Sequence, residues 1–272
     1  MTEGVTDSRF KLGAWLLSED RDTVYEGSKK GDNLHNERTQ IRVPLITVDV
    51  RLTEQLGVQA AVTIPDVTRT TTTNFKETFS GLGDTSIVGW YRLRPRYRWY
   101  GVINVGASLP TGKIETPRFR SELQDGDLVP LSRLQRGSGT FDPLFGASVT
   151  RVVSGTTVFG NVAARVPVAE NSTGLRTGAS SELNGGLARE VGTHRLTAFA
   201  RLGWLHRQQD VFRGTPVLVG GGNWLYMTPG VAAQVGKGVQ VQAEVKLPVY
   251  RSLANRQLDS SAVFQFGISR GF

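Results

Sequence analysis

The sequence predicts an all-β protein: a transmembrane, antiparallel, up-and-down β-barrel of about 12 strands. Three observations predict this fold class. Apolar and polar residues alternate along many segments, the connections between those segments alternate between short and long, and the last segment ends in an aromatic residue. Helical periodicity is nearly absent. No run of about eighteen apolar residues occurs, which excludes a transmembrane helix but not a barrel, because half of the residues in a barrel strand can be polar.

Segments with a two-residue period cover most of the chain. In chain order, the predicted strands are residues 9–17, 40–52, 55–65, 84–93, 98–109, 140–151, 156–168, 180–190, 195–207, 223–235, 239–250 and 260–272. The clearest apolar faces are Leu56, Val58, Ala60, Val62 and Ile64; Ile103, Val105, Ala107 and Leu109; Val158, Val162, Ala164 and Val166; Leu196, Ala198, Ala200, Leu202 and Trp204; and Val239, Val241, Ala243, Val245, Leu247 and Val249. Successive side chains of a strand point to opposite faces, so each of these strands has one apolar and one largely polar face.

The connections alternate in length along the whole chain. The short ones are 53–54, 94–97, 152–155, 190–194 and 236–238, and the long ones are 18–39, 66–83, 110–139, 169–179, 208–222 and 251–259. In an up-and-down meander every second connection lies at the same end of the sheet. All tight turns therefore gather at one rim and all long loops at the other, as in outer-membrane barrels with short periplasmic turns and long extracellular loops. An even number of strands also places both termini at the rim of the short turns.

Strand length and the polar face favour a membrane barrel over a soluble sandwich. About ten residues at roughly 3.3 Å each, tilted near 40°, rise about 25 Å, which matches the apolar band of outer-membrane barrels. A soluble sandwich offers no ready place for Gln, Asn, Arg and Glu on the second face together with one-sided loops. We therefore expect the protein to lie in the bacterial outer membrane, with its apolar face against outer-membrane lipid.

The composition sets further bounds. The 272 residues are enough for one large β domain, so we expect a single barrel domain over residues 1–272. The first residues, MTEGVTDSRF, contain no charged segment followed by an apolar one, so we expect that the native signal peptide is not part of this sequence. Cysteine is absent, which fits an envelope protein and many others.

The chain is basic, with a formal net charge of +8 and a pI near 10.0. Its basic residues are spread along the chain rather than clustered on one element. The one dense basic-aromatic segment, RLRPRYRWY (92–100), is more typical of a tight turn at a membrane interface than of a nucleic-acid site. We expect no nucleic-acid partner.

The C-terminal segment AVFQFGISRGF ends in Phe272, with Phe264, Phe266 and Ile268 on the same face. A final strand with a terminal aromatic residue is similar to the sorting signal that outer-membrane proteins present to the barrel-assembly machinery. We therefore predict that Phe272 is the assembly signal and that this machinery is a partner. Arg270 interrupts the apolar face, and its long stem can carry the charge to the lipid headgroups.

Several segments together resemble one known family. They are GLGDTSIVGWYRL (81–93), GVINVGASLPTGK (101–113), GSGTFDPLFGASVTR (137–151), NWLYMTPGVA (223–232) and LPVYRSLANRQLDSSAVFQFGISRGF (247–272). They are similar to an outer-membrane family named for the MetA pathway of phenol degradation, whereas residues 1–80 match only in strand pattern. The resemblance implies a barrel that moves small, often aromatic or apolar, compounds, and it brings no catalytic residues.

The polar faces of the strands would line the lumen of such a barrel. The predicted pore-lining residues are Arg51, Arg92, Asn104, Arg165, Glu182, Arg201, Trp224, Tyr226, Gln242, Glu244 and Lys246. Basic groups outnumber acidic groups in this set, which predicts a preference for anions or polar solutes, and the two aromatic residues would offer surface to an apolar solute. Alternatively, these side chains pair with one another and fill a narrow barrel.

One specific contact is predicted inside the barrel. Gly230 leaves space between Arg201 and Glu244, which lie two strands apart, so we expect these two charges to interact, with Lys246 nearby.

We therefore predict an outer-membrane channel for diffusion or facilitated uptake of small-molecule solutes, and no enzymatic activity. Two alternatives remain: a soluble or surface-attached ligand-binding β-barrel, and an outer-membrane phospholipase-like enzyme. The phospholipase needs a Ser near a His base, and no Ser lies near His206 in the alternating pattern of its own strand. His35, His194 and His206 are too dispersed for a metal site. The segment GASLPTGKI (106–114) has the wrong spacing for a phosphate-binding loop, so we expect no cofactor and no metal.

Overall fold

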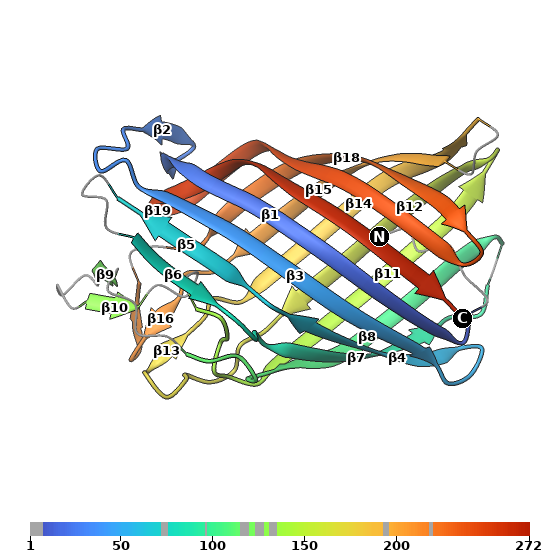
Figure 1. Ribbon diagram of the computed structural model, residues 1–272, viewed down its shortest axis with the longest axis horizontal. Coiled ribbons are helices and arrows are strands. Elements are labelled where there is room, and N and C mark those ends of the chain that lie inside the picture. The colour runs from blue at the N-terminus through green and yellow to red at the C-terminus, as the bar shows by residue number, and fades with distance from the viewer. Residues whose placement is uncertain are drawn as a thin grey trace.

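The computed structural model describes residues 8–71, 76–95, 97–114, 120–122, 128–130, 135–192, 196–217 and 220–272. In these residues all regular secondary structure is β, and the main sheet closes on itself as an antiparallel barrel through pairing of β1 with both β3 and β19 (Figure 1). The strands of the ring are β1 (Phe10–Gly27), β3 (Arg38–Arg51), β4 (Leu56–Thr63), β7 (Thr85–Arg92), β8 (Trp99–Leu109), β11 (Asp142–Val153), β12 (Thr156–Arg165), β14 (Ser180–Val191), β15 (Leu196–Arg207), β18 (Gly222–Gly236) and β19 (Val239–Gly271). The predicted closed, all-β, antiparallel barrel is confirmed. No helix long and apolar enough to cross a membrane occurs in the described residues.

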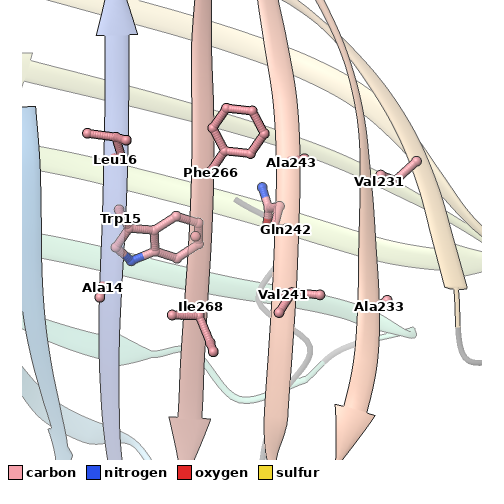
Figure 2. Close-up of a pocket in the computed structure, with 11 residues that line it drawn as sticks. Ala14, Trp15, Leu16, Val231, Ala233, Val241, Gln242, Ala243, Phe266 and Ile268 are labelled. Atoms are coloured by element: carbon pink, nitrogen blue, oxygen red, sulfur yellow. The ribbon is translucent and has the colours of Figure 1, made fainter. Parts of the chain in front are cut away.

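The final element, β19, occupies two neighbouring positions in the barrel wall. Its first part pairs with β18, from Val239 to Leu253, and its second part pairs with β1, from Leu253 to Gly271. The Gly271 N–H donates a hydrogen bond to the Gly238 carbonyl at 2.9 Å, so the two parts lie side by side (Figure 2). The chain therefore reverses direction inside β19.

The predicted loop 251–259 was wrong, since these residues belong to β19. The physical reason is the length of β1, which continues to Gly27 and offers hydrogen-bond partners to residues beyond the membrane band. Residues 18–39 and 66–83 were also predicted as loops, but they contain the end of β1, the start of β3 and the strands β5 (Asp66–Thr70) and β6 (Lys76–Ser80). β5 takes the place beside β3 after β4 has ended, and β6 pairs with β5.

The two rims of the barrel differ, as predicted. The small strands β2 (Lys29–Gly31), β9 (Arg120–Glu122), β10 (Leu128–Pro130), β13 (Leu175–Arg176) and β16 (Val211–Phe212) lie at one end, with β17 (Thr215–Pro216) paired to β16, and the C-terminus lies at the opposite end (Figure 1). Turns at the C-terminal end are tight. Between β11 and β12, Ser154 and Gly155 both have positive φ, 49° and 76°, as a two-residue hairpin turn of type I′ requires.

The usual distribution of side chains is inverted in this barrel. Large apolar residues such as Leu16, Ile103 and Phe266 are exposed on the outer surface, with Phe266 exposed by 52%. Charged residues are buried instead, with exposed fractions of 0% for Asp142 and 7% for Glu244. A water-soluble protein buries the first group and exposes the second. The outer face is therefore suited to lipid and the inner face to polar contacts.

Candidate functional site

The predicted contact between Arg201 and Glu244 is confirmed. The Arg201 guanidinium donates a hydrogen bond to Glu244 Oε1 at 2.6 Å, from β15 to β19 past the intervening β18. Side chains that meet across a skipped strand must lie inside the barrel. The expected reason was only partly correct, because the space above Gly230 is filled by the Phe199 ring, which a Cβ at residue 230 would overlap.

Further predicted lumen residues join this pair. Lys246 Nζ donates to Glu182 Oε1 at 3.2 Å, which links β19 to β14 across two intervening strands. The same ammonium lies 4.3 Å from the centre of the Tyr226 ring, within the range of a cation–π interaction. Gln242 Nε2 donates to Glu244 Oε2 at 3.1 Å. The structure therefore brings Glu182, Arg201, Tyr226, Gln242, Glu244 and Lys246 into one polar network.

A second group of charges lies next to this network, toward the rim with the long connections. Trp224 Nε1 donates to Asp259 Oδ2 at 2.9 Å, and Asp259 also forms an ion pair with Arg251 at 3.1 Å. On β1, Arg21 donates to Glu19 at 2.6 Å. Sequence reasoning missed the charged residues of this group because it placed them in loops. They are Glu19, Arg21, Arg251 and Asp259. The signal was present for β1, where Glu19 and Arg21 continue the inward alternation of Lys11.

These residues enclose a cavity of about 210 Å³ between β1, β15, β18 and β19. Leu17, Leu205 and Val263 supply apolar lining, whereas Glu19, Arg21, Arg207, Trp224, Tyr226, Lys246 and Asp259 are among the residues that supply polar and aromatic lining. A concave site with mixed lining can hold a small molecule by its apolar part and orient it by its polar groups.

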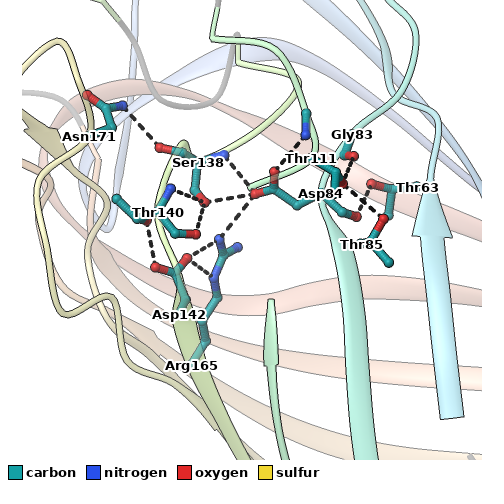
Figure 3. Close-up of polar contacts among 11 residues, drawn as sticks. Thr63, Gly83, Asp84, Thr85, Thr111, Ser138, Thr140, Asp142, Arg165 and Asn171 are labelled. Atoms are coloured by element: carbon teal, nitrogen blue, oxygen red, sulfur yellow. Dashed lines mark hydrogen bonds and ion pairs between the residues drawn. The ribbon is translucent and has the colours of Figure 1, made fainter. Parts of the chain in front are cut away.

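A third network ties a long connection to the barrel (Figure 3). Asp84 accepts hydrogen bonds from the Ser138 N–H at 2.7 Å and the Ser138 hydroxyl at 2.8 Å. Asp142 accepts from the Thr140 hydroxyl at 2.6 Å and from Arg165 Nε at 2.9 Å. Arg165 also lies 3.9 Å from Asp84. Arg165 therefore anchors the end of the connection between β8 and β11.

The remaining predicted residues lie apart from these networks. The Arg92 guanidinium lies 5.6 Å from the Trp90 ring centre, and Trp90 Nε1 donates to Asp49 at 3.0 Å. Asn104 lies beside Gly146 on the neighbouring strand. Arg51 ends β3, and its N–H donates to the Arg9 carbonyl at 2.9 Å. Arg51 and Arg92 both end their strands at the rim of short turns.

His206 has neighbours that its own strand does not reveal. The strand register places Ser181 directly opposite His206 on β14 and Asn223 opposite it on β18. The expectation considered only the alternating pattern of the segment that contains His206, and the pairing of β15 with β14 brings Ser181 beside it. His206 Nδ1 forms a hydrogen bond with Asn223 Oδ1 at 2.9 Å, and its ring stacks on Trp204. In the described structure no hydrogen bond joins the Ser181 hydroxyl to this ring.

Two other predictions fall partly or wholly outside the described residues. The first concerns His194, which is not among the described residues. The second concerns the predicted loop 110–139, much of which, including Pro117 and Asp125-Gly126, is not described either. Within the ranges that the structure describes, no group of three His, Cys, Asp or Glu side chains is arranged to hold a metal ion.

Comparison with known proteins was informative only at the level of structure. No protein-family model and no curated protein sequence matches the chain. The COG4313 outer membrane channel from Pseudomonas putida F1 superposes with a TM-score of 0.76 at 13% identity, covering 99% of this chain and 97% of that one. The β domain of the Bordetella autotransporter BrkA superposes with a TM-score of 0.54 at 14% identity, covering 98% of this chain and 100% of that one. The translocator domain of the autotransporter NalP from Neisseria meningitidis superposes with a TM-score of 0.53 at 12% identity, covering 98% of this chain and 90% of that one.

At these identities the similarity shows the fold alone. The chain has the fold of an outer-membrane β-barrel, and an exposed apolar outer surface around a polar interior places such a fold in the bacterial outer membrane. The expected resemblance to an outer-membrane channel is supported by the first of these structures, whereas no comparison carries the name of the MetA pathway.

Proposed function

We propose that this protein is an outer-membrane channel for diffusion or facilitated uptake of small molecules. The observation that carries the proposal is the polar interior of a closed barrel, where Lys246 reaches Glu182 and Arg201 reaches Glu244 across skipped strands. The cavity beside Trp224 and Tyr226 is the proposed resting place of a solute on its way through.

The charge of the lumen is more balanced than the predicted residue set implied. Acidic residues outside that set, among them Glu19, Asp49, Asp84, Asp142 and Asp259, pair with or lie beside basic or aromatic groups. We therefore propose weak selectivity for anions, set locally by Lys246 and Arg201, and passage of small polar or aromatic solutes rather than of strongly charged ones.

Ion conductance through a planar lipid bilayer tests this proposal. The purified protein should give discrete conductance steps in potassium chloride. Lys246→Glu places a carboxylate beside Glu182 and should move the reversal potential toward cation selectivity. Lys237→Glu, the same change in an exposed turn, is the matched control and should leave the reversal potential in place. Absence of conductance steps from correctly folded protein would argue against a channel.

The phospholipase-like alternative rests on the row of Ser181, His206 and Asn223. This row contains the residue types of a nucleophile, a base and an orienting group. We favour an interfacial role for His206, because its ring is held by Asn223 and Trp204 rather than by Ser181. Hydrolysis of phospholipid vesicles by the protein, abolished by Ser181→Ala, would reverse this assignment.

A further inference from the structure

An apolar groove crosses the outer wall of the barrel where its last strand meets its first (Figure 2). It is an open depression with a volume of about 520 Å³. Small side chains, Ala14, Ala233 and Ala243, form its floor between larger ones such as Phe266 and Ile268. The lining residues are apolar or aromatic apart from Gln242, whose side chain turns into the barrel and donates to Glu244. The part of a ligand that fills this groove must therefore be hydrocarbon.

Two basic residues stand at one end of the groove. Arg270 follows Ile268 by two positions, so its side chain shares the outward face, and it is exposed. Lys237 is exposed in the turn between β18 and β19. The hydrogen bond from Gly271 to Gly238 brings these two residues to neighbouring positions at the rim.

Both cations are available to an anionic group. The structure shows no acidic partner for either of them among the described residues, and the Arg270 guanidinium lies 4.8 Å from the centre of the Phe272 ring. An Arg or Lys at the edge of a lipid-facing surface keeps its stem in the apolar layer and its charge at the headgroups. Guanidinium groups bind phosphate oxygens in a forked, charge-assisted geometry.

We propose that this groove and the adjacent Arg270–Lys237 pair form a binding site for one anionic phospholipid. An acyl chain lies along Ala14, Ala233 and Ala243, and the phosphate contacts the two cations. The site lies at the rim that carries the C-terminus and the short turns, which is the periplasmic rim in the expected topology. The periplasmic leaflet is the phospholipid leaflet of the outer membrane. The proposal does not depend on solute transport, because the groove is on the outside of the wall.

Native mass spectrometry of the purified full-length chain with added phosphatidylglycerol or phosphatidylcholine tests the site. Phosphatidylglycerol should bind as a single retained lipid and more tightly than phosphatidylcholine. Each basic residue near a membrane surface contributes roughly fivefold to the affinity for an anionic lipid, so Arg270→Gln with Lys237→Gln should weaken phosphatidylglycerol binding about 30-fold. Ala243→Leu fills the groove and should weaken the binding of both lipids.

A matched control uses two basic residues of another turn at the same rim. Arg94→Gln with Arg98→Gln removes the same charge from exposed positions and should leave lipid binding unchanged. Equal affinity for the two lipids in the unaltered protein, or an equal loss in both double variants, would overturn the proposal. Ready disulfide formation between two copies of Ala243→Cys would assign the groove to a protein interface and would overturn it as well.

Discussion

Asp142 illustrates how a single charged residue is accommodated inside this barrel. Its carboxylate has no exposed surface, and it accepts hydrogen bonds from Thr140 and Arg165. Burial of an ionised carboxylate costs free energy that only close donors offset. The bond from Thr140 to Asp142 and the bond from the Ser138 N–H to Asp84 hold the end of the connection between β8 and β11 against the barrel wall.

Replacing Asp142 tests this anchoring role. Asp142→Asn keeps the shape of the side chain but removes its charge, and should lower the free energy of unfolding by about 1–3 kcal/mol, because the hydrogen bonds from Arg165 lose their charged acceptor. Urea unfolding of the protein in detergent measures the change. Asp66→Asn, in an exposed position at the start of β5, is the control and should change it by less than about 0.5 kcal/mol.

The alternation of side chains can be tested at two adjacent residues of β19. Phe266 is exposed on the outer face, and Gln265 lies on the opposite face. Phe266→Arg should destabilise the barrel by about 2–4 kcal/mol, since it places a charge in the lipid layer, whereas Gln265→Arg should be tolerated. Unfolding from lipid vesicles provides the measurement, with Phe266→Leu as a control for lost volume. Equal tolerance of both arginines would contradict the assignment of the faces.

At the scale of elements, Phe272 contributes to the closure of the barrel between its last strand and its first. The Phe272 N–H donates to the Phe10 carbonyl at 2.8 Å, and the two rings lie with their centres 5.9 Å apart. The Arg9 N–H donates to the Phe272 carbonyl at 3.1 Å. The C-terminus is thus part of the seam between the last strand and the first.

The predicted role of Phe272 in assembly has a matched test. Phe272→Ala should reduce the yield of heat-modifiable, folded barrel in the outer membrane, because the seam and the proposed assembly signal are both weakened. Phe264→Ala makes the same change on the outer face of the same strand and should reduce the yield much less. Equal yields from the two variants would count against an assembly signal at residue 272.

The extension of β1 and β3 beyond the predicted membrane band is held partly by charge. Arg38 donates to both carboxylate oxygens of Asp20, at 2.8 and 2.9 Å. Hydrogen bonds from Arg38 lower the pKa of the Asp20 carboxyl below its ordinary value, and burial opposes them. Because the folded-state pKa is lowered, this pair stabilises the fold above the pKa of the unfolded chain, about 4, and the contribution is lost as the pH falls through the folded value.

Arg38→Gln should therefore raise the pKa of Asp20 toward its ordinary value. Titration of the Asp20 carboxyl carbon by NMR measures this shift. An unchanged Asp20 pKa would mean that Arg38 does not contact it in solution.

For the whole molecule, the asymmetry of the two rims predicts an orientation in the membrane. Lys29 and Lys30 are exposed in β2, at the rim with the long connections, whereas Lys237 and Arg98 lie in turns at the other rim. Trypsin added to intact cells should cut at Lys29 or Lys30 and spare Lys237 and Arg98, because the long connections are expected to face outward. Cleavage at Lys237 in intact cells would reverse the topology.

The sequence by itself was sufficient to locate the membrane-spanning parts of the ring strands and the alternation of side chains along them, but not the extensions of β1 and β3 or the strand over residues 251–259. Side chains alternate along any pleated strand, so the apolar face of residues 239–249 and the inward position of Glu244 follow from local geometry. The Arg201–Glu244 contact was also predictable, because it depends only on the alignment of three consecutive strands.

Contacts between distant parts of the chain were decided by the tertiary structure. Lys246 meets Glu182, Asp84 meets Ser138 and Trp224 meets Asp259 only because the sheet closes, with a particular stagger, into a barrel of this width. The extra strands at the long-loop rim likewise form because β1 and β3 expose backbone groups that need partners. Alternation is a property of each strand alone, whereas closure and stagger are properties of all the strands together.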